Sequence, residues 1–223
     1  MSARFELPKI GKINSKVNLT DNAVPTIKAM ATNLRNNGYG NLVEDLLGNQ
    51  IDLSSIESLE EKILEKIELY SKDQNDKVLA EIFHAIQLWG GKEGRYIYVR
   101  GDGFDDNFNL ESYRKLVGDC MAGDVDQIIK SISEFDKEVK YLGISFITKH
   151  VRFWSSMNKK TKMLPIYDKI MAQGVMNVDT PKYKDLKVYW DSMRKAAADQ
   201  SLDINDLERS LFNFYRGDNG GVT

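Results

Sequence analysis

The chain has 223 residues, of which 42% are hydrophobic and 29% are charged, and it carries a net charge of −2 with a sequence pI of about 5.8. This composition is ordinary for a globular domain and excludes a uniformly basic nucleic-acid coat protein, so any nucleic-acid contact must come from a local patch. One cysteine, Cys120, excludes an intrachain disulfide, and two histidines cannot complete a zinc site. No signal peptide or transmembrane run is present, so we expect a cytoplasmic protein with no membrane partner, metal or cofactor.

Apolar residues at helical spacing dominate the first half of the chain. The pattern predicts helices over 21–38, 39–47, 54–70 and 76–89. In the third of these, one face carries Ile56, Leu59, Ile63, Ile67 and Tyr70. Each helix is too apolar on one side to be stable alone, so we expect a helical bundle.

A glycine-rich stretch over 90–103 interrupts this pattern. Its centre, 95–100, is compatible with one short β ribbon. No Gly-Lys-Ser/Thr follows a strand there, so the stretch is not a nucleotide-binding P-loop.

The second half of the chain is again helical, with one sharp turn. We predict short helices over 109–117, 125–133 and 134–141, and longer ones over 180–198 and 203–215. Residues 142–145 read as a turn between two helices, in which Gly143 can take a positive φ. Ser145 is well placed to cap the helix that follows, which should run to about Met157.

One carboxylate stands alone after that turn. Asp168 is the only acid between Val139 and Val178, whereas the same window holds seven cations: Lys140, Lys149, Arg152, Lys159, Lys160, Lys162 and Lys169. An ionised carboxylate in this setting could stabilise a developing positive charge, and the cations could hold a polyanion around it. The plainer alternative is that Asp168 only caps the helix beginning near Lys169.

The order of helix, turn, helix, basic loop and Asp168 resembles the helix-hairpin-helix DNA glycosylases. It is most similar to their 8-oxoguanine-glycosylase-like branch, which includes bacterial anti-phage relatives. The resemblance implies an all-α fold of two interleaved lobes that form one domain over 1–223. An N-terminal lobe would occupy about 21–118 and the helix-hairpin-helix lobe about 123–178, with the C-terminal helices of 180–215 packing back.

The same resemblance implies a reaction. The enzyme would flip a damaged or modified base out of double-stranded DNA and leave an abasic site, with Asp168 stabilising the sugar cation or activating the nucleophile. The family spacing counted back from Asp168 reaches Lys149 as a covalent nucleophile (168 − 149 = 19). Counted from the hairpin, the same position is Ile147, and water would be the nucleophile. We prefer the hairpin count, because a loop absorbs two extra residues cheaply.

Further residues would contact the DNA. Backbone groups at the hairpin bind phosphate whatever the base sequence, and basic side chains extend the phosphate track. The candidates are Gly143, Ser145, Thr148, Lys140, Arg152, Lys159, Lys160 and Lys162. Candidates for a pocket that stacks on and reads the extruded base are His84, Gln87, Trp89 and Tyr96. For most of these residues the plainer interpretation is core packing or a solubilising surface charge.

Two other functions remain open at this point. A non-catalytic helix-hairpin-helix module would bind DNA without chemistry, and a helical protein–protein adaptor would have no salt-dependent DNA affinity. For a glycosylase we expect a monomer. The sequence does not say which base is removed.

Overall fold

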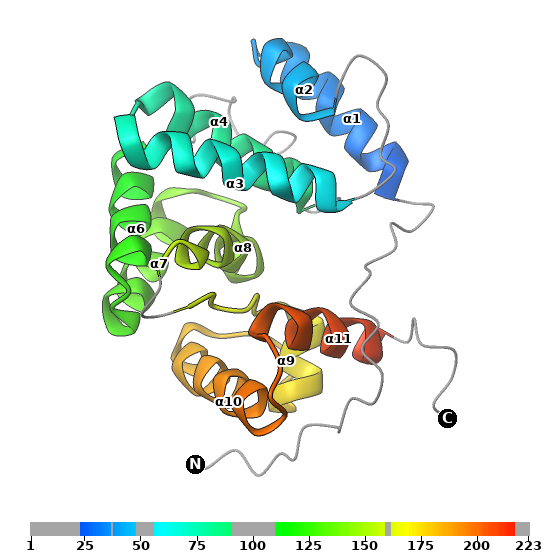
Figure 1. Ribbon diagram of the computed structural model, residues 1–223, viewed down its shortest axis with the longest axis vertical. Coiled ribbons are helices and arrows are strands. Elements are labelled where there is room, and N and C mark those ends of the chain that lie inside the picture. The colour runs from blue at the N-terminus through cyan, green and yellow to red at the C-terminus, as the bar shows by residue number, and fades with distance from the viewer. Residues whose placement is uncertain (1–22, 37, 48–55, 91–109, 159–161, 217–223) are drawn as a thin grey trace.

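The computed structural model describes residues 23–36, 38–47, 56–90, 110–158 and 162–216, without the side chains of 23–26 and 56–58. Every regular element in these ranges is a helix, which confirms the predicted all-α fold (Figure 1). The predicted ribbon at 95–100 lies outside the described residues. So do three site candidates: Tyr96, Lys159 and Lys160.

The helices follow one another closely along the chain. They are α1 (Ala23–Asn36), α2 (Gly40–Leu47), α3 (Ile56–Asp73), α4 (Asp76–Trp89), α6 (Leu110–Ala122), α7 (Val125–Glu138), α8 (Gly143–Ser156), α9 (Lys169–Met176), the 3-10 turn η2 (Tyr183–Asp185), α10 (Leu186–Asp199) and α11 (Ile204–Arg216). In the part of the chain that the structure describes, no helix is long and apolar enough to span a membrane.

Three predicted helix boundaries are wrong. The helix predicted over 109–117 continues to Ala122, and the helix predicted over 180–198 begins only at Leu186, after a 3-10 turn. The two short helices expected over 125–133 and 134–141 form the single helix α7. Its buried stripe of Ile128, Ile132 and Phe135 continues across the expected break, and no glycine or proline interrupts it. The expected break lies at the polar Ser133-Glu134 pair. The buried residues on either side keep the same helical spacing, so the helix continues through that pair.

Helix α8 runs through the middle of the bundle (Figure 1). It packs against α4, α6 and α7, and nine of its residues are buried. Apolar residues are buried on several sides of it, including Phe146, Ile147, Val151, Phe153 and Trp154. A helix that is apolar nearly all round belongs in the interior. The polar residues that α8 also carries must therefore find partners inside the protein.

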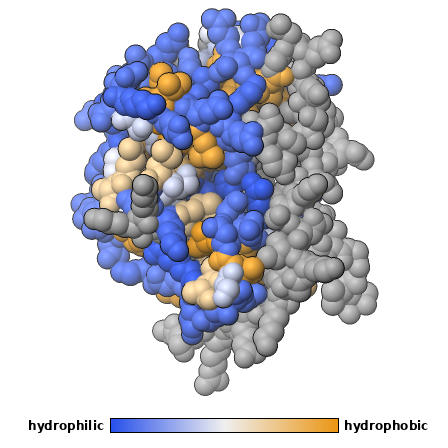
Figure 2. Space-filling model, in the orientation of Figure 1, coloured by the Kyte–Doolittle hydropathy of each residue, from blue (hydrophilic) through white to orange (hydrophobic). Residues whose placement is uncertain are grey.

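The outer surface has the opposite character. On the face seen in Figure 2, hydrophilic side chains cover most of the described surface, and hydrophobic ones appear in small separate groups. Four large hydrophobic side chains among the described residues are exposed: Leu69, Tyr141, Val188 and Phe214. They come from different elements, so they are ordinary isolated exposures.

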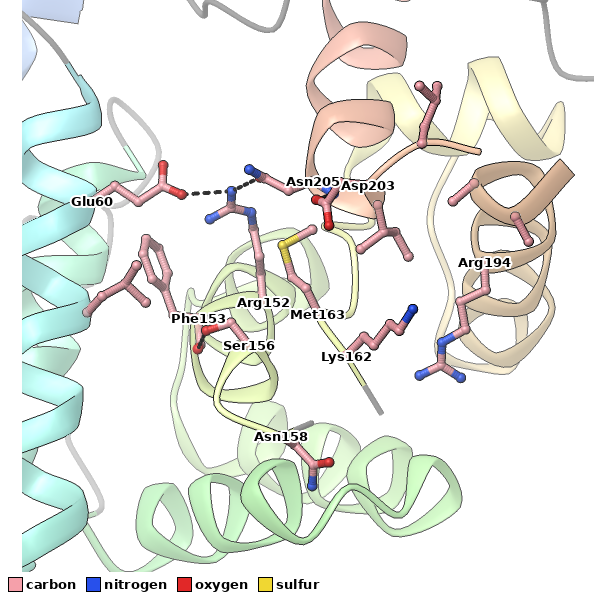
Figure 3. A pocket seen from close by; sticks show the side chains of 15 residues that line it. Glu60, Arg152, Phe153, Ser156, Asn158, Lys162, Met163, Arg194, Asp203 and Asn205 are labelled. Carbon is pink, nitrogen blue, oxygen red and sulfur yellow. Dashed lines mark hydrogen bonds and ion pairs between the residues drawn. The ribbon is translucent and has the colours of Figure 1, made fainter. Parts of the chain in front are cut away.

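A buried ion-pair cluster joins helices that are far apart in the sequence. Arg152 of α8, only 4% exposed, donates from Nε to Glu208 Oε2 at 2.9 Å and from Nη2 to Glu60 Oε1 at 2.9 Å. The same Nη2 donates to Asn205 Oδ1 at 2.5 Å, and Arg209 Nη2 donates to Glu60 Oε2 at 2.6 Å. These five residues, the Arg152 cluster, connect α3, α8 and α11 (Figure 3).

The charges of the Arg152 cluster depend on one another. Burial disfavours the charged guanidinium, but Glu208 and Glu60 outweigh it and raise the pKa of Arg152. Burial raises the pKa of Glu208, against the opposing effect of Arg152. Removing one partner of such a group leaves an uncompensated charge in the interior.

We predict that Arg152→Ala lowers the free energy of unfolding by ~3–5 kcal/mol, because Glu208 and Glu60 lose their shared cation. Urea denaturation followed by circular dichroism measures the change. The control Lys195→Ala, at an exposed position of α10, should change stability by less than about 0.5 kcal/mol. A loss below about 1 kcal/mol for Arg152→Ala would mean that the cluster adds little beyond a surface pair.

Candidate active site and nucleic-acid interface

The predicted turn between two helices is present. Helix α7 ends at Glu138, and α8 begins at Gly143, whose φ of +67° lies in the left-handed region. A Cβ at Gly143 would meet nothing within 4 Å, so the backbone conformation alone favours glycine.

The predicted cap of α8 is wrong. Leu142 occupies the N-cap position, and no side chain caps the helix there. Ser145 lies in the first turn instead, where its carbonyl oxygen accepts from Thr148 Oγ1 at 3.2 Å. The start of α8 therefore keeps backbone N–H groups that no capping side chain occupies, as an anion-binding helix start requires.

Asp168 occupies the N-cap of α9. It has an extended backbone, and its Oδ1 accepts from the Met171 N–H at 2.9 Å. The plainer reading of Asp168 as a helix cap is therefore correct. This role does not exclude a second one, because the cap hydrogen bond and the helix dipole both favour the ionised form.

The segment before Asp168 is attached to α8 at two points. Thr148 Oγ1 accepts from the Tyr167 N–H at 3.1 Å, and Ser155 Oγ accepts from the Leu164 N–H at 2.8 Å. The residue before Lys149 is thus hydrogen-bonded to the residue before Asp168. Two positions that are 19 apart in the sequence (168 − 149 = 19) are brought to neighbouring places in the fold.

The same segment is also held from the C-terminal helices. The Ile166 N–H donates to Glu208 Oε1 of the Arg152 cluster. Trp190 Nε1 donates to the Pro165 carbonyl at 2.9 Å, and Tyr189 OH donates to the Ile166 carbonyl at 2.6 Å. Burial and the charges of Glu208 and Asp168 raise the pKa of Tyr189, so its hydroxyl keeps the proton that it donates. Asp168 therefore follows a backbone segment that is fixed on several sides.

The two candidate nucleophile positions differ in exposure. Ile147 is fully buried, so its side chain is out of reach of a substrate. Lys149 is half-buried, and its Nζ lies 3.9 Å from the centre of the Phe146 ring. Of the two positions, only Lys149 has a side chain that a substrate could reach, and the hairpin count still leaves water as the nucleophile.

The predicted phosphate contacts divide into two groups. Lys140, Gly143 and Lys162 are exposed, and Ser145 is half-buried at the start of α8. Thr148 and Arg152 are buried and hydrogen-bonded within the protein, so they do not lie on an outer surface as expected. Thr148 and Arg152 are buried because α8 is enclosed by other helices. The sequence pattern of one helix does not show that other helices will cover its polar residues.

The candidate base-pocket residues lie mostly in the core. His84 and Gln87 are buried, and Gln87 Nε2 lies 2.8 Å from His150 Nε2. The His150 ring stacks on Phe83, with centroids 4.8 Å apart. Trp89 is half-buried and meets the Phe153 ring edge-on at 5.0 Å. His84 and Gln87 therefore serve packing, and of the three candidates that the structure describes, only Trp89 remains near a surface.

The buried polar side chains around His150 form a chain with one direction. Trp154 Nε1 can only donate, and it donates to Tyr113 OH at 2.8 Å, while that hydroxyl lies 2.9 Å from His150 Nδ1. Burial and the Lys149 charge lower the pKa of His150 to about 3, so its ring is neutral and carries one proton. A proton on Nε2 of His150 lets the Tyr113 hydroxyl donate to Nδ1. His150 Nε2 then donates to the side-chain amide oxygen of Gln87, when the amide is turned so that Oε1 rather than Nε2 faces the ring. In that orientation Gln87 Oε1, which is buried and otherwise has no hydrogen-bond partner among the described residues, accepts a hydrogen bond.

A cavity of about 710 Å³ lies between α3, α8, α10 and α11 (Figure 3). Its wall includes Glu60, Arg152, Phe153, Lys162, Arg194 and Asn205. Sequence reasoning missed it because its residues come from five separate segments, and only Arg152 and Lys162 carried a prediction. Asp168 and Lys149 are not part of this wall. Within the described ranges, no group of three His, Cys, Asp or Glu side chains could hold a metal ion.

Comparison of the chain with protein-family models, with curated proteins and with solved structures gives no match. The relation to the helix-hairpin-helix glycosylases therefore stays a hypothesis that rests on the turn, α8 and Asp168.

We predict that stability falls as the pH is lowered from 7 to 5. Burial lowers the pKa of His84 and of His150 to about 3, with a smaller effect from neighbouring positive charge. Below pH 6.5 the unfolded chain takes up these protons and the folded chain does not, so the folded state loses ~2 kcal/mol per histidine by pH 5. Urea unfolding at both pH values measures the loss. His84→Phe should remove about half of the difference, and an unchanged difference would contradict the neutral buried ring.

Proposed function

We propose that the chain is a DNA glycosylase that extrudes and excises a damaged or modified base, with Asp168 as the carboxylate at the sugar and Lys149 as the nucleophile. The observation that carries the proposal is the hydrogen bond from the Tyr167 N–H to Thr148 Oγ1. It joins the residues directly before Asp168 and Lys149, and this nearness of the two backbone positions supports the proposal that their side chains act together. The exposed glycine turn at the start of α8 adds a phosphate contact.

Glycosidic cleavage needs a negative charge near the sugar, because the transition state resembles an oxocarbenium ion. In this proposal the carboxylate of Asp168, the N-cap of α9, supplies that charge. A carboxylate whose backbone is fixed by its surroundings loses little energy to reorganisation during the reaction. The hydrogen bonds to Ile166 and Tyr167 supply that fixed backbone.

Lys149 supplies the second group. In the proposed reaction its neutral amine attacks the sugar carbon C1′, the bond from C1′ to the base nitrogen breaks, and the base leaves with the bonding electron pair and takes up a proton. The attacking nitrogen loses a proton, the C1′–O4′ bond then breaks with protonation of O4′, and the ring-opened sugar is held as a Schiff base. Hydrolysis of the Schiff base gives an abasic site and free enzyme. The contact of Lys149 Nζ with the Phe146 ring favours the ammonium form, so the proposed step includes loss of a proton from Lys149 before the attack.

We predict that Asp168→Asn lowers base release by ~10²–10³-fold or more, because it removes the charge that stabilises the sugar cation. Asparagine is also a good N-cap, so the fold of α9 should persist. The measurement is abasic-site formation on DNA carrying a panel of modified bases. Asp124→Asn is the matched control, because Asp124 caps α7 in the same manner. If wild type binds DNA but releases no base from the panel, the non-catalytic binding module is favoured instead.

We predict that borohydride traps a covalent protein–DNA adduct with wild type and that Lys149→Gln abolishes it. Borohydride reduces the Schiff base between the amine and the sugar to a stable amine. The control Lys140→Gln, at an exposed position before the turn, should keep the adduct. If wild type releases base without any adduct, water is the nucleophile and Lys149 has no covalent role.

A further inference from the structure

The cavity between α3, α8, α10 and α11 is lined by two kinds of side chain. Apolar ones include Leu64, Phe153, Met163 and Leu202, and charged and polar ones lie among them (Figure 3). Its volume of about 710 Å³ lies within the range of small-molecule sites, which are typically lined by apolar groups with a few placed polar ones.

Arg152 offers a donor of fixed position in this wall. Its Nε and Nη2 are engaged by Glu208, Glu60 and Asn205, which hold the guanidinium in place. Nη1 donates to no residue within the described ranges, and its N–H groups remain for a ligand. An acceptor such as a base carbonyl or a ring nitrogen would bind there without the entropy cost of ordering a free arginine.

Two further cations meet at the cavity. Lys162 comes from the segment after α8 and Arg194 from α10, and both side chains reach toward the same space (Figure 3). Asp203 also lines the cavity, where one of its oxygens accepts from the Asn205 N–H at 2.8 Å. These three side chains carry a net charge of +1, so an anion placed between the two cations is favoured.

We propose that this cavity is a nucleotide site. The heterocyclic base lies against the less buried apolar side chains Leu64, Met163 and Leu202. Arg152 Nη1 donates to an acceptor on the base, and the phosphate lies between Lys162 and Arg194. A nucleotide combines the flat apolar ring, the acceptor edge and the anion that these three features require. It enters either as a free mononucleotide or as a nucleotide extruded from DNA. The inference does not depend on the proposed chemistry at Asp168 and Lys149.

The first arm of the test uses free ligands. Isothermal titration calorimetry with the four deoxynucleoside monophosphates, the matching deoxynucleosides and inorganic phosphate separates the contributions of base and phosphate. We expect Lys162→Gln and Arg194→Gln each to weaken monophosphate binding about tenfold, as loss of a charge-assisted contact does. The control Lys195→Gln changes an exposed residue of the same helix α10 that does not line the cavity, and it should bind as wild type does.

The second arm uses DNA. A duplex with a central 2-aminopurine reports extrusion by a rise in fluorescence. Ala198→Trp, at an exposed position in the cavity wall, fills the space, whereas Lys195→Trp adds the same side chain outside it. A fluorescence rise that Ala198→Trp alone removes identifies extruded DNA as the source. Monophosphate binding that Ala198→Trp alone removes identifies the free nucleotide.

Each remaining outcome overturns the proposal. If wild type neither binds a monophosphate nor raises the 2-aminopurine fluorescence, the cavity is not a nucleotide site. Inorganic phosphate that binds as tightly as the monophosphates makes the cavity an anion site only. Signals that survive Ala198→Trp place the nucleotide elsewhere. Because none of these readings requires base release, a failure here is distinguishable from a failure of the Asp168 assignment.

Discussion

The arrangement of this protein depends on one buried guanidinium. Arg152 takes its counter-charges from Glu60 in α3 and Glu208 in α11, which are 92 and 56 residues away in the sequence. Glu208 uses its other oxygen to accept from Ile166, two residues before Asp168. Satisfying one interior charge therefore sets the relative positions of three helices and of the segment that carries the candidate catalytic acid. Buried ion pairs contribute weakly to stability compared with apolar packing, so we infer that specificity of this arrangement is the main benefit here.

Helix α8 carries a second buried polar system of a different kind. His150 lies two residues before Arg152, which places the two side chains on nearly opposite sides of the helix. His150 is neutral and hydrogen-bonded to Tyr113 and Gln87 of α6 and α4, whereas Arg152 is charged and paired with carboxylates. One enclosed helix thus uses neutral hydrogen bonds toward the N-terminal helices α4 and α6. It uses an ion-pair cluster toward α3 and α11.

Several of the residues on which the two proposals rest lie along α8. Gly143 is at its start, Lys149 is at its middle, and Arg152 and Phe153 face the cavity. Residues three and four apart are neighbours on a helix surface, so Lys149 lies one turn before Arg152 and Phe153, two of the residues that line the cavity. The Nζ of Lys149, however, lies over the Phe146 ring on the preceding turn, so the two proposals concern separate places along α8 and each can fail independently.

Local chemistry alone was enough to predict much of this protein. The helices follow from apolar spacing, Asp168 is a good N-cap wherever the chain goes, and Gly143 adopts the positive φ that the turn requires. These features depend on residues within a few positions of each other, so the sequence by itself determines them. Tertiary structure decided where α8 would lie. A helix pattern identifies an apolar face, but a helix enclosed on several sides buries its polar residues as well. Thr148 and Arg152 therefore became internal partners rather than DNA contacts, and His84 and Gln87 became part of the core. The cavity arises in the same way, because its wall joins Glu60 to Asn205 across most of the chain, and only folding brings such distant residues together.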